Sequence, residues 1–164
     1  MARSPTTSDY PGRPLKRPAW WLYPALPLLG ALMTIAAQAA DQPLARERWQ
    51  HRPLVVAIPD LDRPDYTAWR QELDERRAGV AERDMVVYVV TPTTARRNDE
   101  PLAEPRRQAL VDGFALRPGE RAEFILLGKD GTQKRRGPFP PSLKALFEQI
   151  DSMPMRQREM RRSQ

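Results

Sequence analysis

Two short apolar runs, rich in β-branched residues, constrain the fold of this chain most strongly. They cover Leu54–Ile58 and Met85–Val90, and within them apolar residues do not alternate with polar ones. This pattern is typical of strands that are buried on both faces of a sheet. Between the runs, Tyr66, Trp69 and Leu73 fall at helical spacing on one apolar stripe. The sequence therefore predicts a strand, a helical crossover and a second strand parallel to the first.

The predicted crossover helix has recognisable ends. Proline suits the first position of a helix, so Pro64 marks its start, and Asp62 and Asp65 suit the positive end of its dipole. Gly79 is a natural helix stop. After the second strand, residues 91–104 are polar and contain prolines, which predicts a loop.

The second half of the chain predicts a short helix, a hairpin and a closing helix. The short helix covers Pro105–Asp112, and a third strand covers Phe124–Leu127. The pair Asp130 and Gly131 tolerates the positive φ of a tight turn, which leads into a charged edge strand over Thr132–Arg136. The closing helix is predicted by apolar residues at i, i+3, i+4 and i+7, namely Leu143, Leu146, Phe147 and Ile150.

The order of these elements predicts the fold class. Two parallel strands joined by a crossover, then an antiparallel hairpin and a closing helix, are typical of a thioredoxin-like layer. We therefore predict an α/β, thioredoxin-like fold with a central four-stranded mixed sheet and flanking helices. This domain would span residues 40–152, between an N-terminal segment (1–39) and a basic C-terminal tail (153–164).

The first 39 residues have the pattern of a signal peptide. Three basic residues within 13–17 precede an apolar run over 20–37, and Ala37–Ala39 has the small-residue pattern that signal peptidases accept. Cleavage after Ala39 would give a periplasmic or secreted protein. The alternative is a single-pass membrane anchor, since the run is nearly long enough to cross a bilayer core of roughly 30 Å.

Composition excludes two classes of function. The chain has no cysteine, so it cannot be a thiol-disulfide oxidoreductase or a thiol peroxidase. Four of its 27 basic residues and one of its 21 acidic residues lie in the predicted signal peptide, which leaves a net charge of +3 on residues 40–164. A charge of this size does not predict nucleic-acid binding.

Four short motifs give the chain a family resemblance. They are Trp49 with Arg52-Pro53-Leu54, Glu82-Arg83-Asp84, Gly128-Lys129-Asp130-Gly131 and Ile150-Asp151-Ser152-Met153-Pro154-Met155-Arg156. With these motifs the chain resembles the family of the domain of unknown function 4174, over roughly residues 44–162. The resemblance implies a thioredoxin-like, peroxiredoxin-related exported domain, and it implies no particular activity.

The chain departs from a redox-active thioredoxin at two positions. Pro59–Arg63 stands where a Cys-x-x-Cys motif would follow the first strand, and Glu123 stands where a cis-proline would precede the third. Redox catalysis needs a thiolate of low pKa at the first of these positions. We therefore predict a non-redox domain with no catalytic residue, no cofactor and no metal.

The end of the first strand is the predicted binding region, because ligands gather at the carboxyl ends of strands in α/β sheets. A charged loop there contains Asp60, Asp62, Arg63, Asp65 and Tyr66. We predict that it binds a protein, an envelope component or a small ligand. The alternative function is a carboxylate- or metal-dependent enzyme that uses the three aspartates. The structural alternative is helix capping, with Arg63 pairing locally.

His51 is the single histidine of the chain. A serine-histidine-aspartate arrangement would need it together with Ser142 or Ser152. Neither serine lies in the sequence context of a nucleophile elbow. We therefore expect His51 to be a surface residue ahead of the first strand.

The C-terminal tail is basic, with Arg156, Arg158, Arg161 and Arg162. Its charge predicts contact with an anionic envelope surface or an acidic partner. Membrane contact is otherwise expected only through an uncleaved N-terminal segment. The alternative is a solvated, partly helical end that the methionines at 153, 155 and 160 dock onto the domain.

Overall fold

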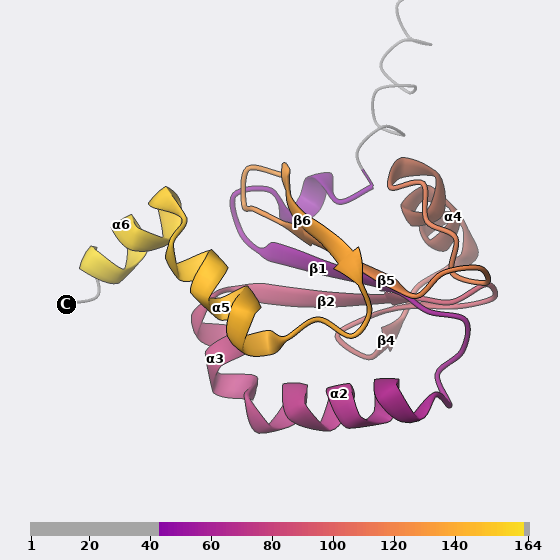
Figure 1. Cartoon of the computed structure of the whole chain (residues 1–164). Coiled ribbons are helices and arrows are strands. Elements are labelled where there is room, and N and C mark those ends of the chain that lie inside the picture. Colours follow the sequence, from indigo (N-terminus) through magenta and orange to yellow (C-terminus); the bar gives the residue numbers. More distant parts are fainter. Residues whose placement is uncertain (1–42, 163–164) are drawn as a thin grey trace, which may run out of the picture.

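The two apolar runs form neighbouring strands at the centre of a mixed sheet, with helices on both faces (Figure 1). The structure is a computed structural model and describes residues 43–162. Its elements in chain order are η2 (Ala45–Glu47), β1 (Arg52–Ala57), α2 (Pro64–Glu75), α3 (Arg77–Glu82), β2 (Met85–Val90), β3 (Ala95–Arg97), β4 (Glu100–Pro101), α4 (Glu104–Gly113), β5 (Glu123–Leu127), β6 (Gln133–Pro138), α5 (Leu143–Asp151) and α6 (Pro154–Arg162).

The sheet has six strands in the order β4-β3-β2-β1-β5-β6. Strand β1 pairs in parallel with β2 and antiparallel with β5. The predicted mixed α/β architecture with flanking helices is confirmed. The predicted number of four strands is wrong, because β3 and β4 form within the segment that was expected to be a loop.

A tight hairpin explains the two additional strands. Asn98 and Asp99 join β3 to β4 with positive φ angles of 45° and 72°. Two consecutive residues at positive φ suit the twist of paired strands, and asparagine and aspartate tolerate that region better than most residues. Asn98 Oδ1 also accepts a hydrogen bond from the backbone N–H of Val87 (2.8 Å). The polar composition of this segment therefore reflects turn chemistry between two short strands.

Alternate residues of the central strands fill two hydrophobic cores. On one face Leu54, Val56 and Ile58 pack with buried residues of α2 and α5. On the other face Val55 and Ala57 pack with Leu110, the buried residue of α4. Figure 1 shows α2, α3 and α5 on one side of the sheet and α4 on the other. Burial on both faces explains why polar residues do not alternate in these strands.

The crossover between β1 and β2 consists of two helices. Helix α2 begins at Pro64, as predicted, and ends at Glu75, and α3 follows it. Gly79 lies inside α3, so the prediction that it ends a helix is wrong. A Cβ atom on Gly79 would lie 2.9 Å from Cε2 of Phe147 in α5. The glycine therefore allows α3 and α5 to pack closely.

The predicted hairpin and closing helix are confirmed. Gly131 has a φ of 78° in the turn between β5 and β6, and β6 is an exposed edge strand. Ser142 caps α5, and its Oγ accepts a hydrogen bond from the backbone N–H of Ala145 (3.3 Å). The buried residues of α5 are Leu143, Leu146 and Ile150.

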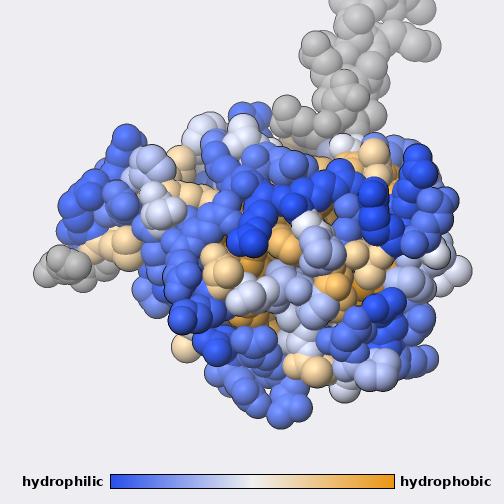
Figure 2. All heavy atoms as spheres, viewed as in Figure 1, coloured by the Kyte–Doolittle hydropathy of each residue, from blue (hydrophilic) through white to orange (hydrophobic). Residues whose placement is uncertain are grey.

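The C-terminal segment forms α6, a mostly hydrophilic helix at one end of the sheet (Figures 1 and 2). Arg156 in this helix is buried, so the segment is not uniformly solvated. Within residues 43–162, no helix is long and apolar enough to span a bilayer. The predicted signal peptide, residues 1–39, lies outside the described residues.

Candidate functional site

The predicted site at the end of β1 makes its polar contacts within the loop itself. Asp60 Oδ1 accepts a hydrogen bond from the backbone N–H of Asp62 (3.0 Å). Asp65 Oδ1 accepts hydrogen bonds from Arg63 Nε (2.9 Å) and from the backbone N–H of Tyr66 (2.9 Å). The hydrogen bond from Arg63 lowers the pKa of Asp65. These contacts shape the loop and engage one backbone N–H in the first turn of α2, whose N-cap residue Arg63 makes no side-chain cap bond.

The ring of Tyr66 is buried against other aromatic rings. Its centroid lies 6.2 Å from that of Trp69 and 6.4 Å from that of Phe139. The cis peptide bond of the described chain joins Phe139 to Pro140, rather than preceding Glu123. Among residues 43–162, no group of three or more histidine, aspartate or glutamate residues could hold a metal ion. The loop has the geometry of a structural cap, and its binding and catalytic roles stay predictions.

The opposite end of the sheet holds charged residues from distant parts of the chain. Arg52, Asp84, Lys129 and Glu159 form what we call the Arg52 network. Arg52 is 1% exposed, and it donates to Glu159 Oε2 (2.9 Å) and to the carbonyl of Arg83 (2.9 Å). Lys129 Nζ donates to Asp84 Oδ2 (2.7 Å) and lies 2.9 Å from Glu159 Oε1. Burial acts to raise the pKa of Glu159, but its bonds to Lys129 and Arg52 lower it.

A second set of contacts, the Arg156 network, joins α3, α5 and α6. It consists of Glu82, Arg83, Asp151 and Arg156. Arg156 is 5% exposed and donates to the Glu82 carboxylate and to the Glu82 carbonyl (2.9 Å). Asp151 accepts hydrogen bonds from Arg83 Nη2 (2.6 Å) and Arg156 Nε (3.3 Å). The two networks together fasten α6 to the rest of the domain.

The predicted basic tail therefore contains two kinds of arginine. Arg156 is buried in its network and cannot meet a membrane or a partner. Arg158, Arg161 and Arg162 are exposed on α6, and their contact with an anionic surface stays a prediction. Met153 packs against the core on the α5 side of the sheet.

The motifs that carry the family resemblance meet at this end of the sheet. Residues 82–84, 128–131 and 150–156 each contribute to the Arg52 network or the Arg156 network, and the N–H of Trp49 donates to the carbonyl of Lys129 (2.7 Å). The Arg52–Glu159 bond joins residues 107 positions apart. This site cannot be recognised from residue spacing, because charges so far apart in the chain leave no local pattern. The resemblance itself was the one signal that grouped them.

A buried carboxylate lies on the α4 side of the sheet. Glu47 accepts hydrogen bonds from the Tyr88 hydroxyl (2.6 Å) and from Arg97 Nε (2.9 Å). Burial acts to raise the pKa of Glu47, but the bonds from Arg97 and Tyr88 lower it. Burial and the bond to Glu47 raise the pKa of Tyr88 to about 12. At neutral pH the cluster is therefore a glutamate–arginine ion pair with a neutral tyrosine, and it fixes η2 against β2 and β3.

His51 belongs to this same cluster. Its Nδ1 lies 2.8 Å from Glu47 Oε2. Of the two serines considered as nucleophiles, Ser142 caps the start of α5, and Ser152 donates to the carbonyl of Gln149 (2.7 Å). Both serine hydroxyls are therefore engaged at the ends of α5, and the described residues form no serine–histidine pair.

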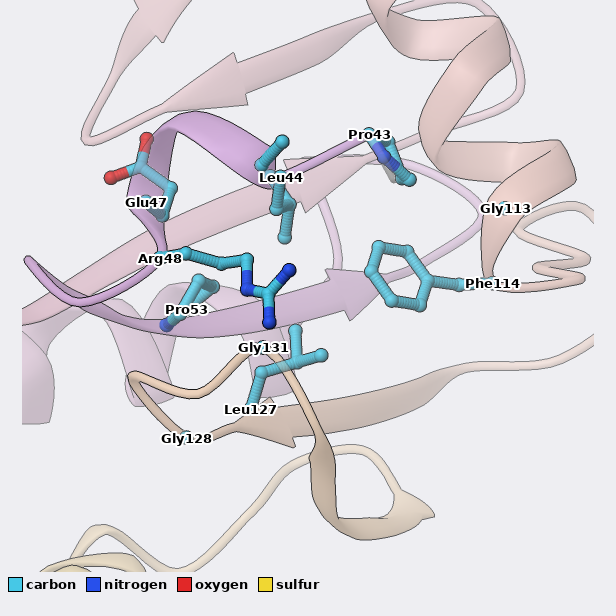
Figure 3. Close-up of a pocket in the computed structure, with 11 residues that line it drawn as sticks. Pro43, Leu44, Glu47, Arg48, Pro53, Gly113, Phe114, Leu127, Gly128 and Gly131 are labelled. Carbon is cyan, nitrogen blue, oxygen red and sulfur yellow. The ribbon is translucent and has the colours of Figure 1, made fainter. Parts of the chain in front are cut away.

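A cavity of about 240 Å³ opens between η2, α4 and the β5–β6 turn (Figure 3). Its walls include the apolar residues Pro43, Leu44, Pro53, Phe114 and Leu127. Figure 3 shows the guanidinium of Arg48 reaching between these walls, whereas the Glu47 carboxylate points away. The stem of Arg48 lies over Gly131, where a Cβ atom would be 3.2 Å from Arg48 Cγ. The cavity is therefore apolar at its walls and cationic at its centre.

Trp49 lies beside this cavity and is 63% exposed, with a φ of 67°. A left-handed conformation costs a bulky residue roughly 1–2 kcal/mol. Its backbone bond to Lys129 holds this conformation, and Arg48 Cζ lies 5.6 Å from the centroid of the indole. The fold thus holds a large apolar side chain in solvent on a strained backbone. Such strain concentrates at functional sites.

The comparison with known families matches residues 43–159 to a domain of unknown function (DUF4174). The chain belongs to this family. The match extends from η2 into α6 and includes both networks and the cavity beside Trp49. No curated protein and no solved structure matches the chain.

Proposed function

We propose that this DUF4174 domain is an exported, non-redox binding domain that recognises a protein partner through the surface around Trp49. We also propose that its fold is thioredoxin-like. The order β1-α2-α3-β2, followed by β5, β6 and α5, supports this assignment, with β3 and β4 added at one edge of the sheet. The chain has no cysteine, so a domain of this fold can serve in recognition but not in thiol chemistry.

The exposed, strained Trp49 is the observation that carries the proposal. Tryptophan and arginine are the residues most enriched at the energetic centres of protein interfaces. Here they are neighbours, Arg48 and Trp49, at the edge of an apolar cavity. The backbone bond to Lys129 holds the main chain of Trp49 in place, so the residue can present its indole to a partner without a backbone rearrangement.

The size of the cavity favours a side chain of a protein over a drug-sized ligand. Pockets for small-molecule ligands typically measure about 300–1,000 Å³, and this cavity measures about 240 Å³. A cavity of about 150 Å³ is enough to hold benzene. We therefore expect a phenylalanine of the partner to insert between Leu44, Phe114 and Leu127, with its ring against the guanidinium of Arg48.

Capture from the periplasmic fraction tests this surface. The full chain is used as bait, together with Trp49→Ala and Phe114→Ala variants and an Asp60→Ala control. We expect the wild type and the control to retain the same partner. The Trp49→Ala variant should retain less by about thirtyfold, the effect of losing an interface residue worth about 2 kcal/mol. Equal retention by the wild type and the Trp49→Ala variant would show that this surface is not the binding site.

Export itself is part of the proposal, with cleavage after Ala39. The support is the basic region, the apolar run and the small-residue site within residues 1–39. N-terminal sequencing of the protein recovered from cells distinguishes the two forms. A chain that begins at Ala40 supports a periplasmic or secreted protein, whereas a membrane fraction that retains residues 1–39 supports the anchored alternative.

The loop over Pro59–Asp65 stays a competing proposal, as a contact surface or as the carboxylate site of an enzyme. Combined alanine replacement of Asp60, Asp62 and Asp65 tests it. An enzyme that uses these carboxylates would lose turnover while staying folded. A structural cap predicts only a small loss of thermal stability.

A further inference from the structure

A second hollow, of about 520 Å³, lies between the β5–β6 turn and the junction of α5 with α6. Gly128 borders both this hollow and the cavity beside Trp49. Arg52 lines it from the sheet, Gln149 lines it from α5, and Met155 lines it from α6. The hollow therefore lies at the same end of the molecule as the Arg52 and Arg156 networks, but it is separate from the surface around Trp49.

Basic side chains dominate this hollow. The positively charged residues in its lining are Arg52, Lys129, Lys134 and Arg158. Asp130 is the one carboxylate in the lining, and Asp84 and Glu159 pair with Arg52 and Lys129 from outside it. These three carboxylates offset three of the four positive charges. The hollow keeps a net positive charge and suits an anion.

The cations retain unused hydrogen-bond donors. An ammonium group has three N–H donors. Lys134 gives one of them to Asp130 (2.7 Å), and Lys129 contacts two carboxylates. Arg158 is exposed and pairs with no other residue in the described part of the chain. Each of these three side chains can therefore bind a further acceptor.

The start of α6 adds to the positive field. This helix runs over Pro154–Arg162, and Pro154 and Met155 line the hollow. The N–H groups of a first helical turn have no partner within the helix, and the helix dipole is positive at that end. Both effects favour an anion beside Met155.

From the charge, the free donors and the start of α6, we propose that this hollow binds a phosphate group. The tetrahedral oxygens of a phosphate can accept hydrogen bonds from Lys129, Lys134 and Arg158 together. An ionised carboxylate has only two oxygens, so it fits these three donors less well.

Calorimetric titration of the purified full chain with inorganic phosphate tests the proposal. We expect phosphate to bind about tenfold more tightly than acetate, whose carboxylate has two oxygens and leaves one of the three donors without an acceptor. A Lys134→Ala, Arg158→Ala double variant should bind phosphate at least about tenfold more weakly. Both side chains are partly or fully exposed, so the variant should stay folded, and a thermal melt checks this.

The matched control is an Arg161→Ala, Arg162→Ala double variant. It removes the same charge, but from positions on α6 outside the lining. We expect its affinity for phosphate to stay within about twofold of the wild type, the size of a screened surface effect. An equal loss in both double variants, or no heat from the wild type with millimolar phosphate, would overturn the proposal.

Vesicles distinguish the two sources of such a phosphate. Binding to phosphatidic acid vesicles that free phosphate displaces and the Lys134→Ala, Arg158→Ala variant loses would identify a lipid headgroup. Binding of free phosphate without vesicle binding would identify a soluble phosphate compound. Vesicle binding that the Lys134→Ala, Arg158→Ala variant retains in full would contradict a phosphate site.

Discussion

The two ends of β1 differ in how their charged residues are paired. At the C-terminal end, Asp60 bonds to Asp62 and Arg63 bonds to Asp65, each only two positions away in the chain. At the N-terminal end, Arg52 bonds to Glu159, 107 positions away. The first set shapes one loop, whereas the second positions α6 and helps to form a hollow. The comparison shows that a charged loop can be local structure, while charges scattered through the sequence can assemble one site.

The topology of the sheet explains why the C-terminal end of β1, where the sequence predicts a binding region, lacks the crevice that binds ligands in other α/β sheets. Ligands bind at the carboxyl ends of strands where neighbouring parallel strands send their crossovers to opposite faces and leave a crevice. In the described sheet, β1 and β2 are the one parallel pair, and every other pairing is antiparallel. The loop that follows β1 therefore adjoins no such crevice.

The largest expected difference between the two ends is in their contribution to stability. An Arg52→Met variant should lose about 2–3 kcal/mol of unfolding free energy, because it leaves Glu159 and Asp84 with one cation fewer in a partly buried site. The matched Arg63→Met variant at the other end should unfold at nearly the wild-type denaturant concentration. Urea denaturation followed by tryptophan fluorescence measures both. Equal losses would remove the distinction between the two ends.

A smaller effect is expected within the basic tail. An Arg156→Met variant should lose about 1–2 kcal/mol, since Arg156 makes charge-assisted hydrogen bonds to Glu82 and Asp151. An Arg161→Met variant of the same helix should show no measurable change. If the two variants unfold alike, α6 is not docked through Arg156.

The backbone strain at Trp49 predicts a difference of about 1 kcal/mol between two variants. A Trp49→Gly variant should be more stable than Trp49→Ala by about that amount, because glycine adopts a φ of 67° without strain. Both variants lose the exposed indole, so its contacts cancel in the comparison. Thermal unfolding of the pair measures the difference, and an alanine variant as stable as the glycine variant would contradict the strain.

The acid sensitivity of the Arg52 network gives the smallest predicted effect. The pKa of Glu159 is lowered in the fold. Its ion pairs therefore contribute fully to the free energy of unfolding above a pH of about 4.3, the ordinary pKa of glutamate. This contribution is lost as the pH falls through the lowered pKa. A Glu159→Gln variant does not titrate at this position. Its stability deficit relative to the wild type should therefore be largest near neutral pH and shrink in acid. A deficit that is constant with pH would contradict this pairing.

Much of the fold could be predicted from the sequence, because strands buried on both faces and amphipathic helices have local patterns. The apolar runs, the Pro64 helix start and the Asp130-Gly131 turn are of this kind. The strands β3 and β4 were missed because their turn uses Asn98 and Asp99 rather than glycine. The site was harder to predict, since Trp49 stands out in the sequence only as part of a family motif, and its exposure and positive φ cannot be seen before the chain is folded.

Affinity for the captured partner tests the central claim most directly. Its dissociation constant is measured for the wild type, for Trp49→Ala at one end of β1 and for an Asp60→Ala, Asp62→Ala variant at the other. We predict that the Trp49→Ala variant binds at least about thirtyfold more weakly, whereas the aspartate variant matches the wild type. A loss of affinity in the aspartate variant alone would place the binding surface at the C-terminal end of β1 and contradict this account.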